Sequence, residues 1–142
     1  MEWYVEVLRK YAVFDGRARR KEYWMYALFT FIIYFAYGLV AGLALALIGR
    51  SDSPVAAILL IYTPIVLYGL AVFVPGLAVT VRRLHDTGRS GWWILISLLP
   101  GIGGIILLIF MCLDSEPGPN LHGLNPKGVV GYGQPLPPYP GM

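Results

Sequence analysis

The most chemically active part of the chain is a short segment, residues 82–93, that lies between two long uncharged runs. It carries five ionisable side chains, those of Arg82, Arg83, His85, Asp86 and Arg89. Arginines at the end of an apolar helix neutralise its negative C-terminal pole and bind phosphate oxygens, often through two parallel hydrogen bonds. The segment therefore predicts a binding surface for anionic groups where an apolar region meets water.

A hydrolase triad is the competing chemistry, because Ser90, His85 and Asp86 are the residue types that such a triad requires. Neighbours such as His85 and Asp86, however, diverge in direction on a helix or a strand, and no nucleophile-elbow glycine pattern surrounds Ser90. Metal binding is disfavoured as well, since the other histidine, His122, is far along the chain. We therefore expect no catalytic site, no metal and no cofactor.

Asp86 is the residue that a simple basic anchor does not explain, since a surface facing anionic lipid gains nothing from a carboxylate. We predict that Asp86, together with His85, joins a polar network with the N-terminal basic segment. Its expected ion-pair partner is Arg17 or Arg20. Partly buried pairs of this kind are costly to break, on the order of 3–5 kcal/mol. The predicted headgroup-binding set comprises Arg17, Arg20, Arg82, Arg83 and Arg89.

Three runs without Asp, Glu, Lys or Arg must position these groups: residues 23–49, 53–81 and 90–113. Each exceeds the roughly 20 residues that cross a hydrocarbon core, and each is apolar on all sides. Only 13% of all residues are charged, against about 25% in ordinary soluble domains. The sequence therefore predicts an all-α integral membrane bundle with about three transmembrane helices.

The third run, residues 90–113, is interrupted midway by Pro100, Gly101, Gly103 and Gly104. Proline removes a backbone donor and glycine loosens a helix, so the run either kinks or turns back as a re-entrant hairpin. We expect a single kinked crossing, because 24 residues suit one span and are short for a buried hairpin. The re-entrant alternative would return the C-terminal part of the chain to the side of the N-terminus.

The orientation follows from the Lys and Arg residues near the ends of the runs. Six precede the first run, one lies between the first two, three lie between the second and third, and one follows. With three crossings, a cytoplasmic N-terminus places nine of them inside and two outside. The distribution predicts a multi-pass membrane protein with a cytoplasmic N-terminus, in which the first run is an uncleaved anchor.

The segments outside the three runs have their own expected structures. Residues 1–22 predict a short amphipathic helix followed by a basic segment, and the helix either lies in the headgroup plane or caps the bundle. Trp24, Trp92 and Trp93 stand at the starts of runs, where indole rings anchor helices at headgroup level. Residues 114–142 contain seven prolines and almost no aliphatic side chains, so we expect a flexible tail.

Three blocks of the sequence carry a family resemblance: Phe14–Trp24, Arg82–Trp93, and Gly118–Asn120 with Gly123 and Pro126. Together they resemble the signature of the DUF805 family, which comprises small bacterial inner-membrane proteins of unknown function. The resemblance covers about residues 3–126 and implies a location in the bacterial inner membrane. The family usually has an aromatic residue just before the glycine of the last block, where this chain has His122.

From these observations we predict a non-enzymatic binding or scaffold protein. Its cytoplasmic surface of arginines and tryptophans is expected to contact the lipid bilayer through anionic phospholipid headgroups, or else to contact a membrane-protein partner; no nucleic acid is expected. One alternative is a homo-oligomeric transporter or channel subunit, in which Gly38 and Gly42 pack neighbouring protomers. A membrane enzyme that acts on a phospholipid through His85 and Asp86 is a further alternative.

Overall fold

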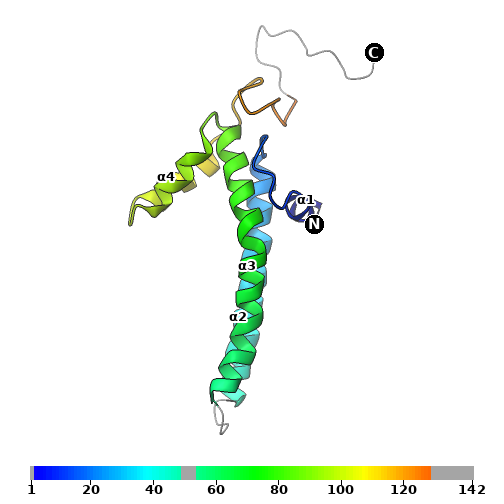
Figure 1. Cartoon of the computed structure of the whole chain (residues 1–142), viewed down its shortest axis with the longest axis vertical. Coiled ribbons are helices and arrows are strands. Elements are labelled where there is room, and N and C mark those ends of the chain that lie inside the picture. The colour runs from blue at the N-terminus through cyan, green and yellow to red at the C-terminus, as the bar shows by residue number, and fades with distance from the viewer. Residues whose placement is uncertain (1, 49–53, 129–142) are drawn as a thin grey trace.

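The computed structural model describes residues 2–48 and 54–128. Its helical segments are α1 (Glu2–Arg9), α2 (Arg20–Ile48), α3 (Pro54–Asp86), the 3-10 helix η1 (Gly91–Leu98) and α4 (Gly103–Cys112). α2 and α3 lie side by side as a long hairpin, and η1 and α4 lean away from one end of it (Figure 1). The all-helical class predicted from the sequence is confirmed for the described residues.

Two of these helices are long enough to cross a membrane. α2 has 29 residues and α3 has 33. At 1.5 Å per residue they span about 43 Å and about 50 Å, more than a hydrocarbon core of about 30 Å. Large apolar side chains cover their outer faces, where Phe31 is 63% exposed and Leu39 is 62% exposed. Such surfaces are stable only against lipid, so the chain is a membrane protein.

Tyrosine hydroxyls join the two long helices. Lipid tails are as apolar as leucine, so helices in a membrane associate through close packing and hydrogen bonds rather than through hydrophobic force. Tyr26 donates a hydrogen bond to the carbonyl oxygen of Val72 at 2.5 Å, and Tyr37 donates one to the carbonyl oxygen of Ile61. These bonds hold α2 against α3 at two depths along the hairpin.

Gly38 and Gly42 do not take part in this contact. A Cβ atom built on either glycine meets no atom of the described chain within 4 Å. The glycine pair therefore packs against no helix of the described chain, and its role between protomers stays a prediction.

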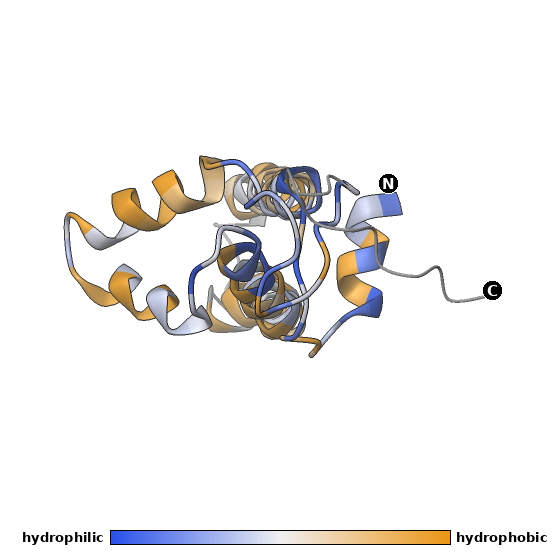
Figure 2. Cartoon of the chain, turned by 90° about the horizontal axis from the view of Figure 1, so that it is seen from above, coloured by the Kyte–Doolittle hydropathy of each residue, from blue (hydrophilic) through white to orange (hydrophobic). Residues whose placement is uncertain are grey.

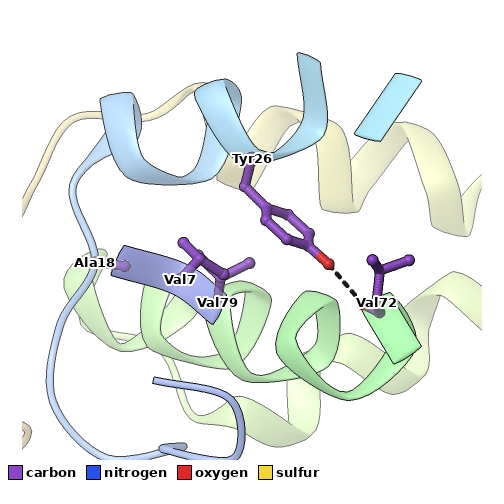
Figure 3. Packing of buried hydrophobic residues seen from close by; sticks show 5 residues of the cluster. All are labelled: Val7, Ala18, Tyr26, Val72 and Val79. Atoms are coloured by element: carbon purple, nitrogen blue, oxygen red, sulfur yellow. Dashed lines mark hydrogen bonds between the residues drawn. The ribbon is translucent and has the colours of Figure 1, made fainter. Parts of the chain in front are cut away.

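Helix α1 packs against the side of the long hairpin, near the end where α2 begins (Figure 1). Val7 is fully buried and belongs to a cluster with Ala18, Tyr26 and Val79, drawn in Figure 3. The ring of Tyr4 stacks on that of Tyr26, with the centroids 5.5 Å apart. The structure therefore places α1 against both long helices, and the two roles predicted for the N-terminal helix, in the headgroup plane or as a cap, stay predictions.

Residues 90–113 do not form the expected single kinked helix, because they form two short helices that fold back on each other. η1 and α4 pack against each other and are joined by a turn, in which Gly101 has a φ of 84° that favours glycine. At 2.0 Å and 1.5 Å per residue they span about 16 Å and about 15 Å, roughly half of the hydrocarbon core each. Close packing depends on Gly103, where a Cβ would lie 1.7 Å from the carbonyl oxygen of Ile96. The structure therefore has the fold-back of the re-entrant alternative, here called the η1–α4 hairpin, while its place in the membrane stays a prediction.

Residues 114–128, here called the C-terminal segment, pack on the end of α3, although the sequence predicted a flexible tail from residue 114 onward. The backbone N–H of Glu116 donates to the carbonyl oxygen of Asp86 at 2.8 Å, and the Asn120 side chain donates to that of His85 at 2.9 Å. Hydrogen bonds to backbone groups therefore hold a segment whose two leucines, Leu121 and Leu124, are exposed. The rest of the predicted tail, residues 129–142, lies outside the described residues.

Candidate functional site

Four segments meet at one end of the long helices and carry most of the predicted site residues. They are residues 10–19, the start of α2, the end of α3 and the C-terminal segment, and we call this region the charged end. Figure 2 shows hydrophilic segments gathered over the ends of α2 and α3, between the apolar η1–α4 hairpin and α1. The backbone N–H of Ala18 donates to the carbonyl oxygen of Arg82 at 3.1 Å and fixes the N-terminal segment to α3.

Asp86 is the centre of a buried charge network. Its side chain is fully buried, and Arg17 Nε donates to its Oδ1 at 3.0 Å. Arg83 Nη1 and the Ser115 hydroxyl both donate to Oδ2, the latter at 2.6 Å. A buried carboxylate needs several donors, because desolvation disfavours its charged form. The predicted pairing of Asp86 with the N-terminal segment is confirmed for Arg17, whereas Arg20 pairs elsewhere.

Arg17 and Arg83 bind backbone carbonyls as well as Asp86. Arg17 Nη1 donates to the Gly118 carbonyl oxygen at 2.7 Å, and its Nη2 donates to that of Glu116 at 2.6 Å. Arg83 donates to two carbonyls at the C-terminal end of α4, where a helix leaves its last carbonyls without intrahelical partners. The two arginines therefore tie the C-terminal segment and the η1–α4 hairpin to α3.

A second buried ion pair, which the sequence analysis did not include, joins Arg82 to Glu22. Arg82 Nη1 donates to Glu22 Oε1 at 2.7 Å, and the side chains are 2% and 5% exposed. Arg82 Nε and Nη2 have no hydrogen-bond partner among the described residues, so Glu22 provides the compensating charge. The signal for Glu22 is present in the sequence, since a carboxylate at the start of an apolar run needs a cationic partner.

These contacts correct the predicted anion-binding role of three arginines. The side chains of Arg17, Arg82 and Arg83 are 1%, 2% and 0% exposed, so they do not reach a lipid phosphate. The sequence could not show this burial, because the hairpin and the segment that cover these arginines were expected across the membrane and in a flexible tail. The three arginines instead hold the charged end together.

Arg20 belongs to the predicted headgroup-binding set and remains exposed. It lines a groove of about 470 Å³ together with Lys21, Trp24, Met25 and Cys112, which we call the α2–α4 groove. Cys112 comes from the end of α4, and the other four residues come from the first two turns of α2. The Arg20 side chain is 43% exposed, and Lys21 and Trp24 are exposed as well. Two cations therefore lie beside apolar side chains where α2 enters the membrane.

Asp114, the first residue of the C-terminal segment, contacts both Arg20 and Lys127. Its Oδ2 lies 3.4 Å from Arg20 Nη2, and its Oδ1 accepts a hydrogen bond from Lys127 Nζ. This bond, together with one from the Ser115 N–H, lowers the pKa of Asp114 below its ordinary value of 3.8. A lowered folded-state pKa means that both contacts are complete above pH 3.8 and are lost only as the pH falls through the lower value. Such exposed pairs contribute little to stability.

The remaining residues of the prediction, half-buried Arg89 and the exposed Trp92 and Trp93, lie in and beside the η1–α4 hairpin. The Arg89 guanidinium lies 4.1 Å from the centroid of the Phe110 ring, a cation–π contact. Trp92 is 78% exposed, and Trp93 is 47% exposed and packs edge-on against Phe110. This exposure suits a membrane interface, and the anchoring role of Trp24, Trp92 and Trp93 stays a prediction.

His85 and Ser90 line one groove of about 420 Å³ beside η1, but the Asp86 side chain binds the arginines instead. The His85 ring stacks flat on His122, with centroids 3.6 Å apart, and its Nδ1 lies 3.3 Å from the Gly16 carbonyl oxygen. The described hydrogen bonds thus do not connect the three residue types of a triad. No group of three metal-ligating side chains occurs within the described part of the chain. The stacked rings of His85 and His122 instead hold the C-terminal segment against α3.

Comparisons with known proteins agree with this architecture. A family model described as "Protein of unknown function (DUF805)" matches residues 11–124. The chain is 44% identical over 127 residues to inner membrane protein YhaH of Escherichia coli strain K12, which covers 89% of this chain and 98% of that protein. It is 42% identical over 129 residues to inner membrane protein YhaI of the same strain, which covers 89% and 97%. No solved structure matches the chain.

Proposed function

Because the chain belongs to the DUF805 family, whose molecular role is unknown, we propose a function from its own geometry. The protein is a non-enzymatic binding protein of the bacterial inner membrane, and its charged end contacts anionic phospholipid headgroups. Similarity to two inner membrane proteins supports the location. The contact is made by the exposed cations at the start of α2 rather than by the buried arginines.

The observation that carries this proposal is the exposure of Arg20 and Lys21 beside Trp24 where α2 enters the membrane. An anionic membrane surface attracts a nearby Lys or Arg by about 1 kcal/mol each. An indole ring prefers the headgroup level, because its apolar body is buried there while its N–H stays wet. The buried ion pairs of Asp86 and Glu22 support the contact by fixing the helix ends from which these side chains project.

The two-crossing topology supports a cytoplasmic charged end. With two crossings, ten of the eleven Lys and Arg residues lie on the same side of the membrane as the charged end, here called the near side. Arg50 alone is assigned to the opposite side. The positive-inside rule therefore favours a cytoplasmic near side, and a distribution of ten to one favours it more strongly than the nine to two of three crossings. The cytoplasmic leaflet also carries the negative surface potential that the exposed cations require.

The proposal is tested by native mass spectrometry of the full-length protein released from mild detergent. The protein is first incubated with equal amounts of phosphatidylglycerol and phosphatidylcholine. Wild type is expected to retain phosphatidylglycerol preferentially, and to retain less of it as salt is raised, because salt screens the contact. Equal retention of the two lipids would contradict the proposal.

A matched pair of variants locates the contact. Arg20→Gln with Lys21→Gln removes two cations at the start of α2, and Arg9→Gln with Lys10→Gln removes the same charge at the end of α1. The first pair is expected to lose most of the preference for phosphatidylglycerol, and the second to keep it. Equal losses would show that only total charge matters and would remove the assignment to α2.

The runner-up is a homo-oligomeric assembly, and one observation favours it. Gly38 and Gly42 are exposed and have open space around them within the described chain, which would let a helix of another protomer approach closely. The same mass spectra report this alternative directly. A lipid-free oligomer of fixed size would support the assembly in place of the lipid contact.

A further inference from the structure

The geometry points to a binding site for one anionic phospholipid in the α2–α4 groove. The phosphate lies against Arg20 and Lys21, and one acyl chain follows the wall formed by Trp24, Met25 and Cys112. This inference rests on the proposed function and adds to it a defined site that holds a single lipid.

The order of side chains along the groove matches the layout of a phospholipid. Arg20 and Trp24 are four residues apart on α2, as are Lys21 and Met25. Each cation therefore lies one helical turn, about 5.4 Å, from an apolar side chain on the same face. α2 runs from the charged end into the membrane, so the apolar member of each pair is the deeper one (Figure 1). A phosphate at the boundary and an acyl chain below it would each meet a matching surface.

The end of α4 supplies the second wall of this site. Arg83 holds the last carbonyls of α4, and Arg20 Nη1 donates to the Cys112 carbonyl oxygen at 3.3 Å. The η1–α4 hairpin is thereby fixed beside α2, and the open groove of about 470 Å³ lies between the start of α2 and Cys112 at the end of α4. A single crossing of residues 90–113 would leave no such groove.

The charges around the groove select an anion. Asp114 is the carboxylate that contacts Arg20, and it also contacts Lys127. Arg20 can therefore turn toward a phosphate while Lys127 keeps Asp114 paired. An exposed ion pair is weak, so this exchange is easy. The apolar wall favours a lipid over free phosphate, because an acyl chain gains contact there and an inorganic ion does not.

Cys112 provides a direct test, because it is the only cysteine of the chain and it lines the groove. The full-length protein is placed in nanodiscs of phosphatidylcholine, with or without phosphatidylglycerol, and the alkylation rate of Cys112 by N-ethylmaleimide is measured. A bound phosphatidylglycerol shields the thiol, so the wild-type rate is expected to fall about five-fold at an occupancy of about 80%.

Two variants make this measurement specific. Arg20→Gln with Lys21→Gln is expected to lose the protection by phosphatidylglycerol. Arg19→Gln removes a neighbouring cation that does not line the groove, and it is expected to keep the protection. Equal slowing in all three proteins would reveal a general effect of an anionic surface and would overturn the inference. An unchanged wild-type rate, or equal protection by millimolar inorganic phosphate in phosphatidylcholine nanodiscs, would overturn it as well.

A second measurement separates this inference from the proposed function. Met25→Trp fills the apolar end of the groove and leaves both cations in place. After a high-salt wash, mass spectrometry is expected to find one phosphatidylglycerol on wild type and none on Met25→Trp, although both prefer this lipid at low salt. If neither prefers it at low salt, the proposed function fails. If both do but neither keeps a lipid after the wash, only the single-lipid site fails.

Discussion

At the scale of single residues, Asp86 shows how a buried charge is stabilised by several partners at once. Asp86 accepts hydrogen bonds from Arg17, Arg83 and Ser115, which come from three segments far apart in sequence. Each donor is itself buried or half-buried, so the loss of one member leaves the others without compensation. The network is therefore complete only when all three segments are packed together.

Replacement of Asp86 by alanine tests this interdependence. Asp86→Ala leaves the Arg17 and Arg83 guanidinium groups buried without their carboxylate, and the expected loss of folding free energy is about 3–5 kcal/mol. Thermal unfolding in mild detergent measures it. Asp114→Ala removes an exposed carboxylate that also pairs with arginine, and it is expected to change the melting temperature little. Similar melting temperatures for Asp86→Ala and wild type would contradict the buried network.

At the scale of elements, the η1–α4 hairpin decides what the charged end can do. Its two short arms fold back on each other, and this return brings the end of α4 to Arg83. This return buries Arg83 and creates the α2–α4 groove beside Arg20. The fold-back of residues 90–113 therefore determines both which cations are exposed and where the proposed lipid site lies.

The close approach of the two arms is tested at neighbouring glycines. A Cβ at Gly103 would lie 1.7 Å from the Ile96 carbonyl oxygen, whereas one at Gly104 meets no described atom within 4 Å. Gly103→Ala is expected to force the arms apart at a cost of about 1–3 kcal/mol or more, and Gly104→Ala to have little effect. Hydrogen exchange of residues 91–112 reports the opening. Equal protection in both variants would argue against the packed hairpin.

The contact of the C-terminal segment with α3 depends on a flat ring at position 122. His122 stacks on His85 at 3.6 Å between centroids, and phenylalanine offers a similar flat ring. His122→Ala is expected to loosen the segment and to speed tryptic cleavage after Lys127 several-fold, while His122→Phe stays close to wild type. Rapid cleavage of both variants would assign the contact to an imidazole-specific bond instead.

At the scale of the whole molecule, the two long helices cross the membrane and the other described elements gather at one end of them. The N-terminal segment and the C-terminal segment meet at Arg17, so both lie on the same side. An α2–α3 hairpin alone exposes apolar side chains along most of its length, and lipid must cover them. The molecule is thus a membrane anchor that carries one folded, charged end.

This topology predicts the side on which the C-terminus lies. A fluorescent protein that folds only in the cytoplasm, fused after Met142, is expected to fluoresce, and alkaline phosphatase fused at the same place is expected to be inactive. The reason is that ten of the eleven Lys and Arg residues share the near side in the two-crossing arrangement. Active phosphatase in this fusion would contradict the predicted side, because either the charged end would face the periplasm or residues 90–113 would cross the membrane.

The sequence by itself determined the features that depend on local composition. Uncharged runs longer than a hydrocarbon core identified a helical membrane protein, and the isolated carboxylate of Asp86 among cations predicted its pairing with Arg17 or Arg20, of which Arg17 is the partner. The first inference needs only the rule that a long apolar helix is stable in lipid, and the second only the rule that a buried charge is paired.

Only the tertiary structure decided the path of residues 90–113 and the exposure of the arginines. A run of 24 uncharged residues with a proline and three glycines midway can form one kinked helix or two short ones. The choice depends on how closely Gly103 approaches Ile96 and on whether Arg83 meets the end of α4. The first contact requires the backbone geometry of the turn between η1 and α4, and the second joins segments that are distant in sequence, so composition and spacing could not reveal them.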